Sequence, residues 1–216
     1  MNPRIARIAA ITAIFAAGAA HAASPNLVKN GDFSLVDDLS VPVNGYVVVD
    51  AGANSISHWT VGKDSVDVVD GPMYNAINGF SIDLIGTPGP GEISQKIKGL
   101  QADTSYTLTF DLARNPNADK AAVKVEFLGQ IMTFKAPSDN SVTAESFTFL
   151  GSALSQASDS QLKFFSIDKG NAYSGAILDN VSVTAAVPEP ETYGMLLGGL
   201  GLIGFVARRK QRNKAA

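Results

Sequence analysis

Few residues in this chain have the chemistry of a catalytic centre. Cysteine is absent, which excludes cysteine proteases, thiol redox chemistry and cysteine-based zinc sites. Beyond the first 22 residues the only histidine is His58, so no histidine pair can bind a metal there. One histidine could serve a Ser-His-Asp triad. However, the sequence has no Gly-x-Ser-x-Gly elbow, and no phosphate-binding glycine loop stands at a strand-to-helix junction.

Carboxylates remain as candidate catalytic groups, because a glycosidase needs only two of them. The densest group is Asp64, Asp67, Asp70 and Asp83. Asp67 and Asp83 stand in segments of alternating polarity, where an outward, solvated aspartate is the simpler interpretation. Carboxylate catalysis is therefore the least favoured hypothesis.

Aromatic side chains are the candidates for ligand binding, since a sugar ring can stack on an aromatic face. Trp59 is the only tryptophan; a position in the core is the favoured interpretation for it, and sugar stacking is the alternative. Tyr46, Tyr74 and Tyr173 stand near loops that contain glycine or asparagine, so they are the better candidates for side chains that face solvent.

The segments that must position these residues show the alternation of apolar and polar residues that is typical of β-strands. Apolar and polar residues alternate over 106–112, 123–127, 147–149 and 181–183, which predicts strands with one buried and one solvated face. Turn residues separate them, as at Asn30-Gly31-Asp32, Asn44-Gly45, 87–91 and 115–117. No amphipathic helix of convincing length is present. The pattern predicts an all-β domain, an antiparallel β-sandwich of jelly-roll type.

The N-terminus has the three parts of a secretory signal peptide. Arg4 and Arg7 precede an apolar stretch over 8–20, and Ala20-His21-Ala22 is a small-x-small cleavage pattern. We expect residues 1–22 to be a signal peptide that signal peptidase removes. A retained N-terminal anchor is the alternative.

The C-terminal segment 188–216 also has three parts. Pro188, Glu189 and Pro190 break any helix. Residues 193–207 are apolar and uncharged, which predicts a short transmembrane helix, and a basic end over 208–216 follows. That end opens with Arg208, Arg209 and Lys210, which mark the cytoplasmic side.

This order resembles the PEP-CTERM sorting signal of Gram-negative bacteria. The resemblance implies that an exosortase processes the tail near Pro188, Glu189 and Pro190. It also implies passage through the inner membrane and a host that makes extracellular polysaccharide. An ordinary single-pass tail anchor is the alternative.

Between the two ends lies one domain, over 24–187. It holds 10 of the 17 Lys and Arg residues and 18 of the 20 Asp and Glu residues, so its formal net charge is −8. Such a surface repels nucleic acid and anionic lipid, tolerates neutral glycans and attracts divalent cations.

The domain resembles the choice-of-anchor C family, a galactose-binding-like β-sandwich found with PEP-CTERM tails. The resemblance rests on the order of the segments 26–33, 56–61, 65–69, 81–84, 91–95, 106–112 and 178–183. Related sandwiches hold a structural calcium ion between the first and last strands. This resemblance implies Asp179 as a ligand, with Asp32 as a substitute partner because Ser34 stands where an acidic residue is usual. Calcium is the one candidate cofactor.

We therefore expect an exported, envelope-associated surface protein that is not an enzyme. It would be a binding or matrix module that contacts exopolysaccharide, at the cell surface or in the extracellular matrix. The alternatives are a structural surface protein without a specific ligand and, less favoured, a carboxylate-dependent glycan-cleaving enzyme.

Overall fold

The computed structural model describes residues 24–150, 158–167, 173–186, 194, 196–201, 203 and 204. Within these residues eleven strands and one short 3₁₀ helix, η1 (Pro72–Tyr74), follow one another. The strands are β1 (Tyr46–Asp50), β2 (Thr60–Lys63), β3 (Ser65–Asp70), β4 (Phe80–Asp83), β5 (Glu92–Leu100), β6 (Tyr106–Arg114), β7 (Ala122–Phe127), β8 (Gln130–Lys135), β9 (Thr143–Phe149), β10 (Ser158–Ser166) and β11 (Ala176–Ala185).

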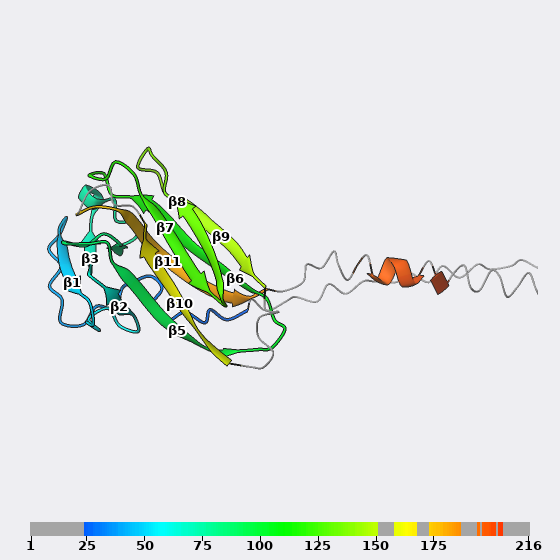
Figure 1. Ribbon diagram of the computed structural model, residues 1–216. Helices are drawn as coiled ribbons and strands as arrows, with labels where there is room; N and C mark the ends of the chain where they lie inside the picture. The colour runs from blue at the N-terminus through cyan, green and yellow to red at the C-terminus, as the bar shows by residue number, and fades with distance from the viewer. Residues whose placement is uncertain are drawn as a thin grey trace, which may run out of the picture.

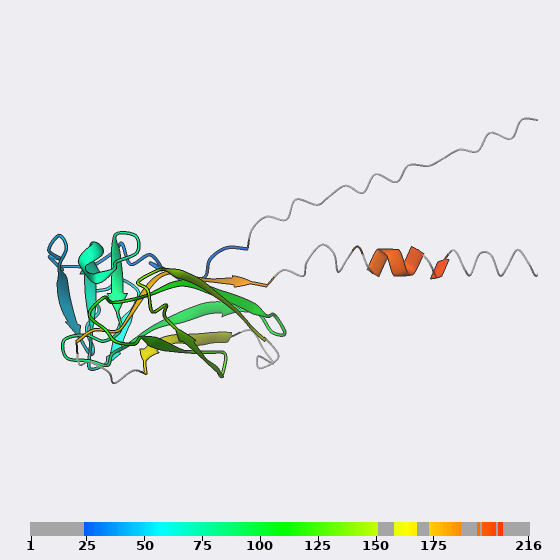
Figure 2. The ribbon, with the colours of Figure 1, turned by 90° about the horizontal axis from the view of Figure 1, so that it is seen from above.

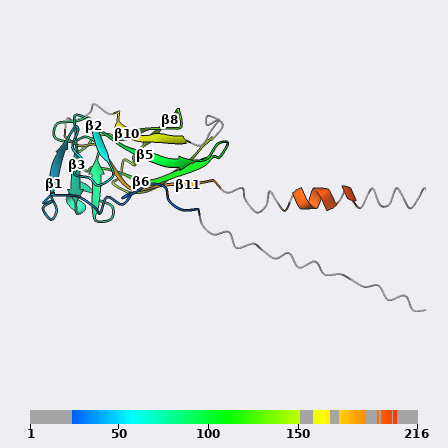
Figure 3. The same cartoon turned by 90° about the horizontal axis from the view of Figure 1, so that it is seen from below.

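The strands form two antiparallel sheets that face each other (Figure 1). One sheet has six strands in the order β1-β3-β4-β11-β6-β9, and the other has five in the order β2-β5-β10-β7-β8. Views from above and below show the two layers and place β1 at one end of the sandwich (Figures 2 and 3). Strands distant in sequence are neighbours, as β11 lies between β4 and β6.

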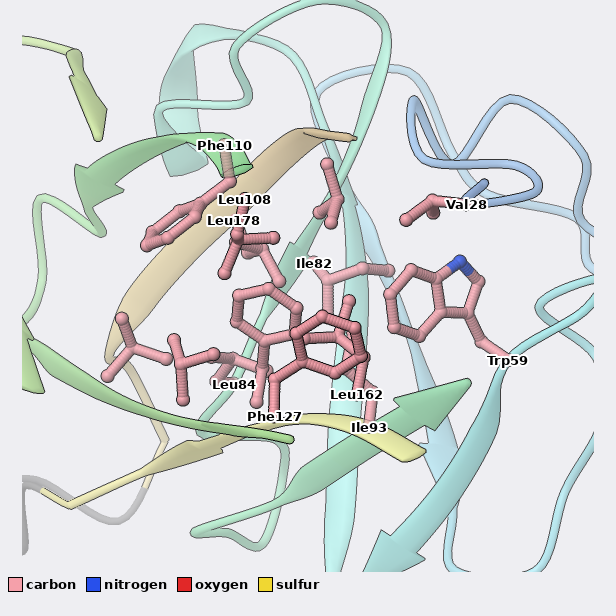
Figure 4. Close-up of a cluster of buried hydrophobic side chains, with 14 of the residues drawn as sticks. Val28, Trp59, Ile82, Leu84, Ile93, Leu108, Phe110, Phe127, Leu162 and Leu178 are labelled. Atoms are coloured by element: carbon pink, nitrogen blue, oxygen red, sulfur yellow. The ribbon is translucent and has the colours of Figure 1, made fainter. Parts of the chain in front are cut away.

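A continuous apolar core fills the space between the sheets (Figure 4). Phe110, Phe127 and Phe164 project into it from β6, β7 and β10, at alternate strand positions. Rings meet edge to face, as between Phe110 and Phe164, whose centroids are 5.3 Å apart. Burial of this apolar surface is the main stabilising contribution to the fold.

The outer face of the six-stranded sheet is covered at one end. Segment 71–79, which includes η1, folds back over β3, β6 and β11. Its residues Tyr74, Ala76 and Ile77 pack on the buried Val69 and its neighbours on those strands. Strand β3 is therefore buried on both faces from Ser65 to Val69.

The predicted antiparallel sandwich is confirmed, and β6, β7, β9 and β11 contain the four stretches whose alternation predicted strands. The predicted C-terminal transmembrane helix is not confirmed. Residues 196–201 are helical, but no helix in the described part of the chain is long and apolar enough to span a bilayer. The expected signal peptide, 1–22, lies outside the described residues.

Candidate functional site

A pocket of about 570 Å³ lies at the end of the six-stranded sheet that carries β1 and β3. We call it the tyrosine pocket, because Tyr46, Tyr74 and Tyr173 all line it. The other lining residues are Asp67, Val69, Thr87, Asn115, Asn117 and Ser174. The structure thus brings together three ligand-binding candidates that are up to 127 residues apart in the sequence.

Three different elements position the tyrosines. Tyr46 opens β1 and stands opposite Val69 of β3. Tyr74 ends η1, and its ring meets that of Tyr46 edge to face with the centroids 5.5 Å apart. Tyr173 lies three residues before the start of β11 and is 60% exposed, while Tyr46 is 39% exposed. Aromatic surface therefore faces solvent at the pocket, although most other aromatic side chains of the domain are in the core.

Gly71 permits the close approach of the chain segments that carry Tyr46 and Tyr74. Its φ is 74°, a conformation that favours glycine. A Cβ atom there would overlap the side chain of Asn44, which precedes β1. The Asn44 backbone N–H in turn donates to Asp70 Oδ2 at 3.2 Å. This contact holds the start of β1 against the end of β3.

Asp67 supplies a carboxylate on the polar side of the pocket. Its Oδ1 accepts from the backbone N–H of Thr87 at 3.1 Å, and its Oδ2 accepts from the Thr87 hydroxyl at 2.9 Å. Burial raises the pKa of Asp67 to about 6, although the two bonds from Thr87 oppose the shift. At neutral pH the ionised carboxylate still has lone pairs to accept ligand hydroxyls.

Asp83 lies behind Asp67 as its cross-strand partner in β4 and is 1% exposed. Its Oδ2 accepts from Asn115 Nδ2 at 2.7 Å and from the Gly175 N–H at 3.2 Å, and its Oδ1 accepts from the Ile85 N–H at 2.9 Å. Burial raises its pKa to about 7. Asp83 therefore accepts hydrogen bonds from two loops, one with Asn115 and one with Gly175 next to Ser174, and holds both loops at the pocket.

Sequence reasoning missed this positioning role of Asp83. A signal was present, because Asp83 is followed by Leu84 and Ile85 and preceded by Ile82. A carboxylate among apolar neighbours on both sides is more often buried and hydrogen-bonded than one in a polar segment.

Trp59 has no face open to a ligand. It is 1% exposed and packs against Phe33 and Phe164, with ring centroids 5.5 and 6.2 Å away. Its Nε1–H donates to the carbonyl oxygen of Asn30 at 2.9 Å. Trp59 is therefore a core side chain, as the favoured interpretation of the sequence had it, and its ring has no face on which a sugar could stack.

The two candidate calcium ligands lie in different surroundings. Asp179 is fully buried; its Oδ2 accepts from Asn78 N–H and the Ser81 hydroxyl, and its Oδ1 accepts from Asn180 N–H. Asp32 is exposed, and its Oδ1 accepts from the N–H and hydroxyl of Ser34. Protein donors already surround the carboxylate of Asp179, so these residues do not fit a calcium site. Within the described ranges no group of three or more His, Cys, Asp or Glu could hold a metal ion.

The four clustered carboxylates are not gathered at the pocket. Asp67 lines it and Asp83 is buried behind it, whereas Asp64 and Asp70 are directed elsewhere. Asp64 pairs with Lys63 at 3.6 Å, and Asp70 accepts from the backbone of Asn44. The sorting residues Pro188, Glu189, Pro190, Arg208, Arg209 and Lys210 lie outside the described residues.

Comparisons with known proteins assign families to both parts of the chain. The family model described as "Protein of unknown function (DUF642)" matches residues 26–184. The model described as "PEP-CTERM protein-sorting motif" matches residues 186–210, which confirms the predicted resemblance and implies export.

One curated relative is halomucin of Haloquadratum walsbyi (strain DSM 16790 / HBSQ001). It is 29% identical over 182 residues, which cover 83% of this chain and 2% of halomucin. The chain thus spans only a small fraction of the length of that relative.

Two solved structures have a similar fold. A cyclase from Fischerella sp. TAU has a TM-score of 0.53 at 17% identity, over 78% of this chain and 98% of that one. An arabinose-bound α-L-arabinofuranosidase, MgGH51, has a TM-score of 0.50 at 12% identity, over 76% of this chain and 27% of that one. At these identities the likeness concerns the fold alone.

Proposed function

Because the chain belongs to the family described as "Protein of unknown function (DUF642)" and ends in a PEP-CTERM protein-sorting motif, we propose that it is an exported, non-catalytic binding module for saccharides of the cell envelope. In this proposal residues 1–22 are a signal peptide, 24–187 are the binding domain and 188–216 are a sorting tail that an exosortase processes. Exopolysaccharide at the cell surface of a Gram-negative host is the ligand.

The observation that supports this proposal most directly is the convergence of Tyr46, Tyr74 and Tyr173 on one pocket. Ligand pockets combine apolar and aromatic surface with a few positioned polar groups. Here the tyrosine rings would contact the C–H faces of a sugar. The carboxylate of Asp67 and the amide of Asn117 would hydrogen-bond its hydroxyls.

The arrangement of the carboxylates favours binding over cleavage. Glycoside hydrolysis needs two carboxyl groups on either side of the scissile bond. Of the cross-strand pair, Asp67 borders the pocket, while Asp83 is 1% exposed and is not among the residues that line it. A substrate in the pocket would therefore meet one carboxylate of the two that the reaction requires.

A glycan array tests the proposal directly, with the exported protein as probe. We expect Tyr46→Ala and Tyr173→Ala each to weaken saccharide binding about tenfold, with little change in thermal stability, because these side chains are 39% and 60% exposed. Phe165→Ala is the matched control, since Phe165 is a half-buried aromatic residue on the five-stranded sheet. Equal loss of binding in all three variants, or no binding of any saccharide by the wild type, would contradict the proposal.

A further inference from the structure

A second groove, of about 410 Å³, has the opposite chemistry to the tyrosine pocket. We call it the basic groove. It is lined by Leu27, Lys29, His58, Gln95, Lys96 and Lys98. Three lysines and the only histidine of a segment with net charge −8 thus converge on one concave surface. The composition of the domain alone would not predict such a concentration of positive charge.

The fold holds the N-terminal segment that carries Lys29 against β5. Gln95 is 6% exposed, and its side-chain amide pairs with the backbone of Lys29 in both directions. Lys29 N–H donates to Gln95 Oε1 at 2.7 Å, and Gln95 Nε2–H donates to the Lys29 carbonyl oxygen at 2.8 Å. On the other side of the segment, Leu27 N–H donates to Val183 O of β11 at 2.8 Å. These hydrogen bonds hold the backbone of Lys29 beside β5, the strand that carries Lys96 and Lys98.

Strand alternation brings the other two lysines to the same surface. Ile97 is fully buried in the core, so its neighbours Lys96 and Lys98 point to the outside of the five-stranded sheet and are exposed. Of the ion pairs among described residues, the groove lysines take part in one, between Lys96 Nζ and Asp159 Oδ2 at 3.2 Å. Among the described residues Lys29 and Lys98 take part in no ion pair, so the groove keeps a net positive charge.

His58 completes the rim through a constrained turn. Its φ of 71° is uncommon for a residue other than glycine. The turn is closed by the Trp59 N–H, which donates to Ile56 O at 2.9 Å. It places the indole of Trp59 in the core and leaves the imidazole of His58 exposed. Constrained conformations of this kind are frequent at binding sites.

We propose that the basic groove binds the carboxylate groups of an acidic polysaccharide, such as a chain of uronic acids. Ammonium groups form charge-assisted hydrogen bonds with carboxylates, and the groove volume is within the range of ligand sites. The groove is concave, whereas a bilayer presents a broad flat surface that the other, acidic faces of the domain would repel. Export implied by the sorting motif makes an extracellular polymer the fitting polyanion. The proposal does not depend on the tyrosine pocket.

Binding of the full-length chain to polygalacturonate, with neutral dextran as the uncharged reference, tests the inference. We expect the wild type to bind polygalacturonate and to lose this binding as salt is raised. The double variant Lys29→Glu/Lys98→Glu should bind about tenfold more weakly or worse. Each substitution replaces an attraction between an ammonium group and a carboxylate of polygalacturonate by a repulsion between two carboxylates. The control Lys135→Glu/Lys163→Glu changes the net charge by the same amount outside the groove and should retain binding within about twofold.

Several outcomes would overturn the inference. These are an absence of polygalacturonate binding by the wild type, an equal loss in both double variants, and equal or tighter binding of anionic lipid vesicles or DNA. If the Lys29→Glu/Lys98→Glu protein does not fold, Lys96→Gln/Lys98→Gln repeats the measurement with milder changes. Neutral saccharides on the glycan array test the tyrosine pocket, whereas polygalacturonate tests the basic groove, so failure here and failure of the saccharide proposal are distinguishable.

Discussion

The outer faces of the two sheets differ in charge and in exposure. The outer face of the six-stranded sheet carries aspartates at alternate strand positions: Asp50, Asp67, Asp83, Asp111 and Asp179. The outer face of the five-stranded sheet carries lysines in the same kind of positions: Lys96, Lys98, Lys124, Lys135 and Lys163.

Burial separates the two sets more sharply than charge does. Asp67, Asp83 and Asp179 are at most 4% exposed, because segment 71–79 and neighbouring loops cover their end of the sheet. Lys96 and Lys98 remain exposed beside their groove. Alternation in a strand therefore shows which side chains leave the core, but not whether they reach water. On the covered face the buried aspartates organise the fold, and of these three only Asp67 also borders the tyrosine pocket.

The largest expected effect is on stability and contrasts the two faces directly. Asp179→Ala leaves the N–H groups of Asn78 and Asn180 and the Ser81 hydroxyl without their acceptor. We expect the free energy of unfolding to fall by about 2–4 kcal/mol in chemical denaturation. Lys163→Ala, on the open face, should change it by no more than about 0.5 kcal/mol. Similar values for both variants would remove the contrast.

A second effect is the pH dependence of stability. Burial raises the pKa of Asp67 to about 6, of Asp83 to about 7 and of Asp179 to about 6. An unfolded aspartate has a pKa of about 3.9. Between these values the folded state binds more protons than the unfolded state, so the free energy of unfolding falls as pH rises from about 4 to about 7.

Asp67→Asn should remove part of this dependence. The asparagine can accept from the Thr87 N–H and donate to the Thr87 hydroxyl oxygen, so the local contacts are retained. We expect a gain on the order of 1–2 kcal/mol at pH 8 and little gain at pH 4, measured by denaturation at both pH values. Asp38→Asn, a change at an exposed carboxylate, is the control and should leave the profile unaltered.

The same substitution should act in the opposite direction on binding. If the ionised Asp67 accepts ligand hydroxyls, Asp67→Asn should weaken saccharide binding about three- to tenfold while it stabilises the domain. Wild-type affinity should likewise fall as pH drops below about 6, where Asp67 becomes protonated. Titration calorimetry at pH 5 and pH 8 measures both effects. Unchanged affinity in the variant would exclude Asp67 from the ligand contacts.

The smallest expected effect concerns calcium. Protein donors surround the carboxylate of Asp179, so a chelator should leave the melting temperature unchanged within about 1 °C. Calorimetric scans with and without chelator measure this. A clear decrease with chelator that Asp179→Ala abolishes would restore the calcium prediction.

Local patterns in the sequence were sufficient for part of the fold and part of the candidate site. Alternation at 106–112 and 123–127 predicted strands that are present as β6 and β7. The glycine and asparagine residues near Tyr46, Tyr74 and Tyr173 indicated exposure at loops, and all three line one pocket. The prediction that Asp67 and Asp83 are solvated was wrong, because segment 71–79 and the loops that carry Thr87, Asn115 and Gly175 cover that end of the sheet.

The sequence by itself determined the all-β class, the absence of cysteine chemistry and the sorting motif, because each depends on residue type or on spacing within a few positions. Only the tertiary structure decided that three distant tyrosines share a pocket, that Asp83 joins two loops and that Lys29 meets Lys96 and Lys98 in a groove. The physical reason is that strand order places β11 between β4 and β6, and sets the N-terminal segment against β5. Contacts of this kind depend on the pairing of elements across the whole chain, which no local pattern encodes.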